Sequence, residues 1–228
     1  MNILHLAANR WWTGSADPII QLVSGLRDHG HHALLAVTPG DRFEAKAREA
    51  GLPLVEDVRL RPRVAPIDLV RDVNRLRALV AAEAIDVIHA HHSHDHWLAL
   101  LVRPRRADGS RAVIARTFHN LRSVHRAWPT RPLYRRTAAF FAVSRQIEAR
   151  CREAGIPAER VWWIPGAADP RFREAGNGQA IRAEFGLGQA PVVVSVARFA
   201  ANRRHDLLLA GFGRLLDKVP QARLLLVG

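Results

Sequence analysis

One stretch near the C-terminal end restricts the fold more than any other, because it joins a strand, a basic loop and a helix. Residues 191–216 read PVVVSVARFAANRRHDLLLAGFGRLL. The β-branched run at 192–196 follows a proline and predicts a strand that is buried on both faces, as in a parallel sheet. Apolar residues then recur at the spacing of a helix that buries one stripe: Leu208, Phe212, Leu215, Leu216 and Val219. The stretch therefore predicts an α/β fold.

The loop between this strand and this helix carries Arg198, Arg203 and Arg204. Ligands of open α/β sheets bind at the carboxyl ends of strands, and both helix N-termini and arginines favour anions. The loop therefore indicates a ligand that carries phosphate. A solvated basic turn is the alternative that the spacing alone leaves open.

Strands and helices alternate along the rest of the chain. Strands are predicted at 3–7, 31–37, 86–90, 112–117, 138–143 and 161–164, with helical patterns between most of them. Such alternation predicts a doubly wound, mainly parallel sheet from Met1 to about Gly166, with helices on both faces. Gly14 and Ser15 lie in the loop after the first strand, where a glycine lets backbone amides approach a phosphate or a sugar. A plain turn is the alternative for this loop.

Composition excludes several classes of protein. The formal charge is +13, nearly all of it from arginine. No block of five consecutive basic residues occurs, so nothing except the net charge supports nucleic-acid binding. Cys151 is the only cysteine, which fits a reducing compartment. No run of 18 apolar residues predicts a spanning helix, and the first residues lack the pattern of a signal peptide. We expect a cytoplasmic protein without nucleic-acid partners.

A cluster of histidines follows the strand at 86–90, in the sequence HAHHSHDHW. The five are His89, His91, His92, His94 and His96. Imidazoles at this density could ligate a metal. Because the segment directly follows a strand, alternate side chains would point to opposite faces, so they are not expected to converge on one ion. We expect no metal site.

Several motifs resemble retaining glycosyltransferases of the GT-B type, family 4. SVARFAANRRHDLLLAGF is similar to the family pattern G-R-L-x-x-x-K-G-x-D-x-L-x-x-A-F, with Arg198 on its arginine and Asp206 on its aspartate. Arg203 stands where the family has lysine, Arg204 where it has glycine, and Ala197 where it has the first glycine. TFHN at 117–120 resembles the family's T-x-H-[DN]. The longest match is AFFAVSRQIEARCREAGIPAERVWWIPGAADPRF, although the family's asparagine is missing from it.

The resemblance implies retaining, hexosyl-type transfer of a sugar from a nucleotide-sugar donor to an acceptor hydroxyl, without a metal. It implies that His119 faces the reacting sugar, and that Arg198 and Arg203 hold the donor diphosphate. Gly14 and Ser15 would also bind the donor. The departing diphosphate would help to deprotonate the acceptor. The acceptor class is a glycan, a lipopolysaccharide precursor or a glycolipid precursor, as in polysaccharide biosynthesis.

The resemblance also divides the chain into domains. Residues 1–168 would form an N-terminal, acceptor-side Rossmann-like domain, 169–190 a linker, and 191–228 the first β-α-β unit of a donor-binding domain. Since only that unit of the second domain is present, we expect a truncated chain with little activity alone. The alternative is a non-catalytic basic module that binds an anionic polymer or a partner protein. A basic, aromatic stretch at 122–136 could contact anionic lipid at the inner face of the membrane, or could simply be a solvated surface.

Overall fold

The computed structural model describes residues 1–9, 12, 14–60, 66–103, 109–126, 128–167, 176 and 178–228, with the backbone alone at residue 128. Parts of the predicted loops at 59–66 and 103–111, and of the predicted linker at 169–190, lie outside these ranges. The chain divides into two compact units, Met1–Asp169 and Pro170–Gly228.

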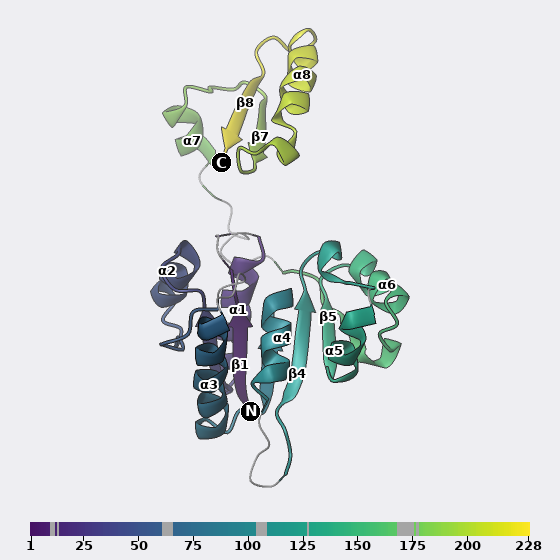
Figure 1. Ribbon diagram of the computed structural model, residues 1–228. Helices are drawn as coiled ribbons and strands as arrows, with labels where there is room; N and C mark the ends of the chain where they lie inside the picture. The colour runs from purple at the N-terminus through teal and green to yellow at the C-terminus, as the bar shows by residue number, and fades with distance from the viewer. Residues whose placement is uncertain are drawn as a thin grey trace. The chain divides into compact units, whose positions relative to one another are not determined.

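The first unit is built on a parallel sheet of six strands (Figure 1). The strands are β1 (Asn2–Ala7), β2 (His32–Val37), β3 (Val87–Ala90), β4 (Val113–Phe118), β5 (Ala139–Ala142) and β6 (Val161–Trp163). Their order is β2-β1-β3-β4-β5-β6, and every neighbouring pair is parallel. The predicted sheet is therefore confirmed, with boundaries that differ by a residue or two.

Helices pack on both faces of this sheet. They are α1 (Ala16–Asp28), α2 (Arg42–Glu49), α3 (Pro66–Ala82), α4 (Ser93–Leu101), α5 (Arg131–Arg135) and α6 (Arg145–Glu153), with short 3-10 turns η1 (Leu121–Ser123), η2 (Trp128–Thr130) and η3 (Ala158–Arg160). Alternation along β1 explains the two layers, because successive side chains point to opposite faces. Leu4 and Leu6 pack in a core with residues of α3 and α4, whereas Ile3 packs with residues of α1 and α2.

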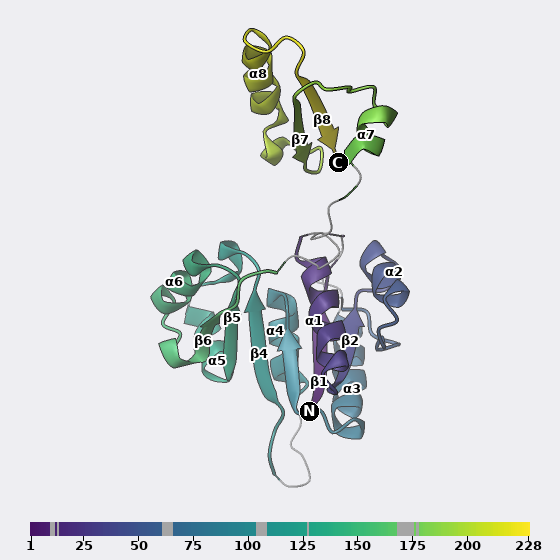
Figure 2. The same ribbon diagram turned by 180° about the vertical axis from the view of Figure 1, so that it is seen from behind.

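The face that carries α1 is only partly covered. Seen from behind, α1 lies over the β1 side of the sheet, and no described helix of this unit lies over β4 (Figure 2). A cavity of about 590 Å³ occupies that region, and its lining includes Ile3, Leu22, Val113 and Phe141. Its lining is largely apolar, but His89, His91, Thr117 and His119 also border it.

The structure around the histidine segment differs in part from the prediction. The predicted strand at 86–90 is confirmed as β3, which ends at Ala90. The residues from Leu98 to Val102 predict a helix, but α4 already begins at Ser93, so the histidines do not alternate between two faces as in a strand. Asp95 in the first turn stabilises this early start, because its carboxylate accepts the backbone N–H of His92 at 2.9 Å. His89 thus lies in β3, His91 and His92 lie in the connection, and His94 and His96 lie in α4.

Two further segments border the sheet. Ser144 directly follows β5 and its connection, where a serine favours a helix start, and its hydroxyl caps α6 by accepting the N–H of Ile147 at 3.3 Å. The basic stretch at 122–136 contains part of η1, together with η2 and α5. Leu133 and Tyr134 of α5 are buried, whereas Arg131 and Arg135 are exposed.

The second unit is a small β-α-β element preceded by a helix. It contains α7 (Gly178–Glu184), β7 (Val192–Val196), η5 (Ala201–Arg203), α8 (His205–Leu216) and β8 (Arg223–Val227). β7 and β8 pair in parallel, as predicted. The prediction that β7 is buried on both faces is wrong, since Val194 and Val196 are exposed. β7 has one neighbouring strand among the described residues, so much of its surface stays uncovered.

No helix in the described ranges is both long enough and apolar enough to cross a membrane.

Candidate active site

The carboxyl ends of β1, β3 and β4 meet around a polar cavity of about 400 Å³ in the first unit. Parallel neighbours bring these ends to one edge of the sheet, where ligands of open α/β sheets bind. The cavity is lined by one residue of β4, Arg116, and by residues that follow the three strands or lie at the starts of α1 and α4: Ala8, Ser15, His91, His92, Ser93, His94, His119, Asn120, Arg122 and Ser123.

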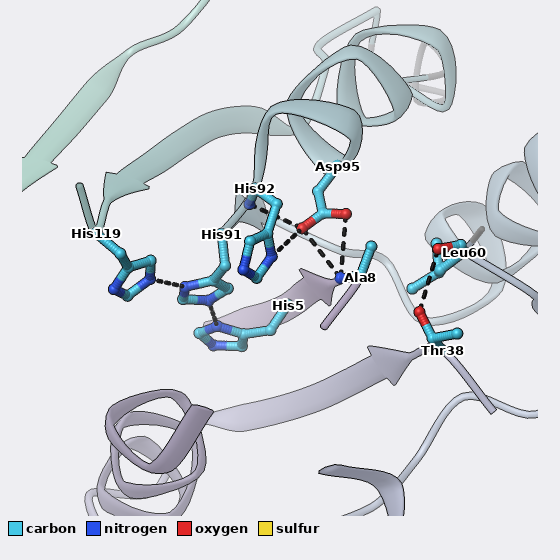
Figure 3. A network of polar contacts seen from close by, with 8 residues as sticks. All are labelled: His5, Ala8, Thr38, Leu60, His91, His92, Asp95 and His119. Carbon is cyan, nitrogen blue, oxygen red and sulfur yellow. Dashed lines mark hydrogen bonds and ion pairs between the residues drawn. The ribbon is translucent and has the colours of Figure 1, made fainter. Parts of the chain in front are cut away.

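A chain of three imidazoles runs from the core to this cavity (Figure 3). His5 Nδ1 lies 3.1 Å from His91 Nε2, and His91 Nδ1 lies 3.3 Å from His119 Nε2. His5 and His91 are buried, and His119 is partly exposed at the cavity. β1, the β3–α4 connection and the end of β4 thus position one histidine after another.

Burial keeps these imidazoles neutral at pH 7. Desolvation lowers the pKa of His5 to about 3. The pKa of His119 is lowered to about 4, first by desolvation and then by the nearby His92 and Arg116. The pKa of His91 is well below its ordinary value for the same reason. His119 can therefore exchange hydrogen bonds with a sugar, but it does not supply a positive charge.

Asp95 links the chain segments that follow β1 and β3. Its carboxylate is fully buried and accepts hydrogen bonds from the Ala8 N–H at 3.2 Å and from the His92 N–H at 2.9 Å. His92 Nδ1 lies 3.1 Å from the same carboxylate. Figure 3 shows this carboxylate between the end of β1 and the start of α4. One buried charge thus ties two strand ends together.

Three buried histidines could hold a metal, and they are not the five of the histidine-rich segment, for which we expected no metal site. Ring nitrogens of His5, His89 and His91 lie within 4.8 Å of one another, and all three residues are buried. His89 Nε2 is already 2.8 Å from the hydroxyl of Thr117. Only two members belong to the histidine-rich segment. His5 was missed because a single histidine within an apolar strand gives no motif.

The basic loop of the second unit lies between β7 and α8. Arg198 and Arg203 are exposed and form no ion pair with a described residue. Arg204 has the left-handed conformation, with φ 51° and ψ 45°, and its side chain pairs with Asp206 at 3.0 Å. The chain therefore keeps, with an arginine, the backbone conformation that a glycine adopts most easily.

Gly14 and Ser15 stand at the start of α1. A Cβ added to Gly14 would meet no atom within 4 Å, so open space lies beside it. Ser15 lines the same cavity as His119. The structure thus brings Ser15 and His119 together within the first unit. Sequence reasoning missed Arg116, although one charged residue within an apolar strand was a usable signal.

Solved structures with a similar fold include Anabaena Alr3699/HepE in complex with UDP and glucose, with a TM-score of 0.76 at 18% identity over 99% of this chain and 60% of that one. Sucrose-phosphate synthase from Thermosynechococcus elongatus gives a TM-score of 0.68 at 18% identity, over 100% of this chain and 62% of that one. The fold is therefore that of the GT-B, Rossmann-like glycosyltransferases, as the sequence resemblance implied.

Within that class, the chain belongs to Glycosyltransferase Family 4, whose sequence profile matches residues 13–172. A curated relative, mannosylfructose-phosphate synthase from Agrobacterium fabrum, is 34% identical over 82 residues, which is 35% of this chain and 18% of that protein. The chain spans about 60% of the length of the first of these solved structures.

Proposed function

We propose that the protein transfers a sugar, with retention of anomeric configuration, from a nucleotide-sugar donor to an acceptor hydroxyl. The observation that carries the proposal is the position of His119, which stands at the carboxyl end of β4 beside a polar cavity in a family 4 chain. Alr3699/HepE, which has a similar fold, was crystallised with UDP and glucose, and this supports a uridine diphosphate sugar as the donor.

His119 would contact the sugar that is transferred. As a neutral imidazole it accepts or donates one hydrogen bond to a sugar hydroxyl, and His91 holds its other side in place at 3.3 Å. In a site of low dielectric such a bond is worth more than in water. His119 is therefore a positioning and stabilising contact rather than a cationic acid.

Arg198 and Arg203 would bind the donor diphosphate. The bond from the anomeric carbon to the diphosphate oxygen breaks, and the acceptor oxygen bonds to that carbon on the same face. The acceptor proton passes to the leaving diphosphate, whose developing charge the two guanidinium groups stabilise. Because these cations balance the charge, we propose that transfer needs no metal. The histidines His5, His89 and His91 would then serve as hydrogen-bonded core residues.

The acceptor is proposed to be a glycan or a lipid-linked precursor met in the cytoplasm, at the inner face of the membrane. The exposed arginines of the 122–136 stretch support a contact with anionic headgroups. Flotation of the protein with vesicles of phosphatidylcholine, with and without phosphatidylglycerol, tests this location. Equal recovery with both vesicles would contradict it.

The transfer itself is tested by proton NMR on the full-length protein with UDP-glucose and a panel of hydroxyl acceptors. The α-linked donor should give an α-linked product, recognised by its small anomeric coupling, together with one UDP per product. A β-linked product would contradict retention. A metal requirement is tested by treating the protein with a chelator and measuring its zinc content. Transfer that persists with less than one zinc per chain would agree with the absence of a metal requirement.

A further inference from the structure

The histidine row of His5, His91 and His119 leaves one nitrogen unpaired at its buried end (Figure 3). His5 Nε2 is buried and has no hydrogen-bond partner among the described residues. His5 Nδ1 lies 3.1 Å from His91 Nε2, and His91 Nδ1 lies 3.3 Å from His119 Nε2. At the other end, His119 Nδ1 bonds to no described residue and is not among the buried unpaired atoms, so it is accessible at the cavity. The histidine row therefore has a closed inner end and an open outer end.

Only two arrangements of protons are compatible with the histidine row. Burial lowers the pKa values of all three rings, so each imidazole is neutral at pH 7 and has one N–H donor and one bare acceptor nitrogen. Each hydrogen bond needs one donor and one acceptor, so the direction of one bond fixes the direction of the other. The N–H groups point either all outward, from His5 to the cavity, or all inward, from the cavity to His5.

The unpaired nitrogen of His5 favours the outward arrangement. If the N–H groups pointed inward, His5 would carry its proton on Nε2, as a buried donor with no acceptor among the described residues. If they point outward, Nε2 is bare, and the Nδ1 proton of His5 is bonded to His91. Unpaired buried N–H groups are rarer in proteins than unpaired acceptors, because the bonds that they lose to water are not replaced. The two buried rings therefore set the position of the His119 proton.

The outward arrangement gives the cavity a hydrogen-bond donor. His119 accepts from His91 through Nε2 and keeps its own proton on Nδ1, because the bond made by one ring nitrogen decides which nitrogen is protonated. His5 and His91 are 0% and 2% exposed, so packing holds both rings before any ligand binds. A donor that is prepared in this way needs no reorganisation when the ligand arrives.

We propose that His91, backed by His5, is a positioning residue that keeps His119 in its Nδ1–H form, so that His119 donates a hydrogen bond to an oxygen of the transferred sugar. The proposal rests on the proposed sugar transfer, and it adds the direction of the hydrogen bond and the residues that set it. A fixed donor requires that the sugar present an oxygen to this nitrogen. A donor substrate that is deoxy at that position should therefore be a poor one, because it leaves the N–H unpaired.

The position of the proton is tested apart from activity, by proton–nitrogen NMR correlation on the full-length protein with isotope-labelled histidine. Protonated and bare nitrogens of a neutral imidazole differ widely in nitrogen chemical shift, so the spectrum shows which of the two carries the proton. The signals of His119 are identified by their loss in His119→Ala. Wild type at neutral pH should show His119 protonated on Nδ1. Protonation on Nε2, alone or in an equal mixture with Nδ1, would overturn the proposal.

Two variants test the role of His91 in the same spectra. His91→Phe keeps a ring but breaks the histidine row, so His119 should shift toward the Nε2–H form that histidine prefers in water. His89→Gln is the matched control, because it replaces a buried histidine that packs on His91 and can keep the bond to Thr117, and it should leave His119 as in wild type. An unchanged His119 in folded His91→Phe, or the same shift in both variants, would overturn the role of His91. These readouts need no transfer, so their failure differs from failure of the proposed function.

Turnover then tests whether the sugar uses the Nδ1 proton. The side-chain amide nitrogen of asparagine is as many bonds from Cα as Nδ1 of histidine, and that of glutamine as many as Nε2. His119→Asn should therefore retain about tenfold more kcat for transfer from UDP-glucose than His119→Gln, which is the effect of one hydrogen bond. Melting temperatures of the two variants show that both are folded. Equal kcat values, or the reverse order, in folded proteins would overturn donation from Nδ1.

Discussion

The cavity of the first unit and the basic loop of the second present cations in opposite ways. Arg116 is held by packing in the sheet, and His119 is held by its hydrogen bond to His91. Arg198 and Arg203 are exposed, and the shape of their loop depends on the left-handed backbone of Arg204. A fully buried polar group such as Asp95 contributes to stability, whereas a partly exposed or exposed group can lose function with the stability unchanged. Each prediction below uses this difference.

The largest effect should come from acid, because it acts on the buried histidines of the first unit together. A histidine whose folded pKa is below 6.5 contributes stability that is fully present above pH 6.5 and is lost as the pH falls toward the folded value. For His5, with a pKa of about 3, this loss is about 1.4 kcal/mol per pH unit. His89, His91 and His96 have lowered pKa values and add to it.

Urea unfolding at pH 7.5, 6.5 and 5.5 measures this slope. His5→Gln should make it shallower by about 1.4 kcal/mol per unit below pH 6.5. His29→Gln, at an exposed position, should leave it as in wild type. The same slope in His5→Gln and wild type would show that His5 is not buried in its neutral form.

Asp95→Asn should have the next largest effect, again on stability. The amide cannot accept all the N–H groups that the carboxylate accepts, and Arg116 loses a nearby negative charge, so about 3 kcal/mol should be lost. Calorimetry should show a melting temperature lower by roughly 6–12 °C. Asp28→Asn, at the exposed end of α1, should change it by little. Equal melting temperatures for both variants would contradict the role of Asp95.

In the basic loop the effect should fall on turnover. Arg198→Ala and Arg203→Ala each remove charged hydrogen bonds to phosphate, and kcat/KM for the donor in the full-length protein should fall about tenfold to a hundredfold. Their melting temperatures should match wild type because both side chains are exposed. Arg204→Ala should change turnover much less, since its side chain pairs with Asp206. If Arg204→Ala were as damaging as the other two, the alignment of this loop would be wrong.

A smaller effect is expected for Arg204→Gly. A residue with a side chain in the left-handed region costs about 1 kcal/mol more than glycine, so the variant should be slightly more stable. Chemical denaturation of the chain gives the comparison, with Arg203→Gly as the control that should not gain stability. A loss of stability in Arg204→Gly would mean that the pair with Asp206 outweighs the strain.

The sequence predicted the sheet better than it predicted the cavity. Apolar runs at 3–7 and 112–117 specify parallel strands directly, because burial on both faces leaves no alternation. The contact of His5 with His91 joins residues 86 positions apart, and no local spacing encodes it. The start of α4 at Ser93 was missed because the run of histidines drew attention away from Asp95, whose position in the first turn favours a helix start.

The error at β7 has another cause. Its valines do predict a strand, but whether both faces are buried depends on neighbours that the strand itself does not specify. Arg116 illustrates the reverse case, since its charge is visible in an apolar strand, but only the packed sheet shows that two of its nitrogens lack a hydrogen-bond partner among the described residues.

The central claim is that His119 contacts the sugar during transfer, and one comparison tests it most directly. The full-length wild type and His119→Ala would be compared in kcat for transfer from UDP-glucose, with melting temperatures measured in the same buffer. We predict a fall in kcat of about a hundredfold or more, since a hydrogen bond at the reacting sugar contributes mainly in the transition state, with a melting temperature within a few degrees of wild type. An unchanged kcat in a folded His119→Ala protein would contradict the account.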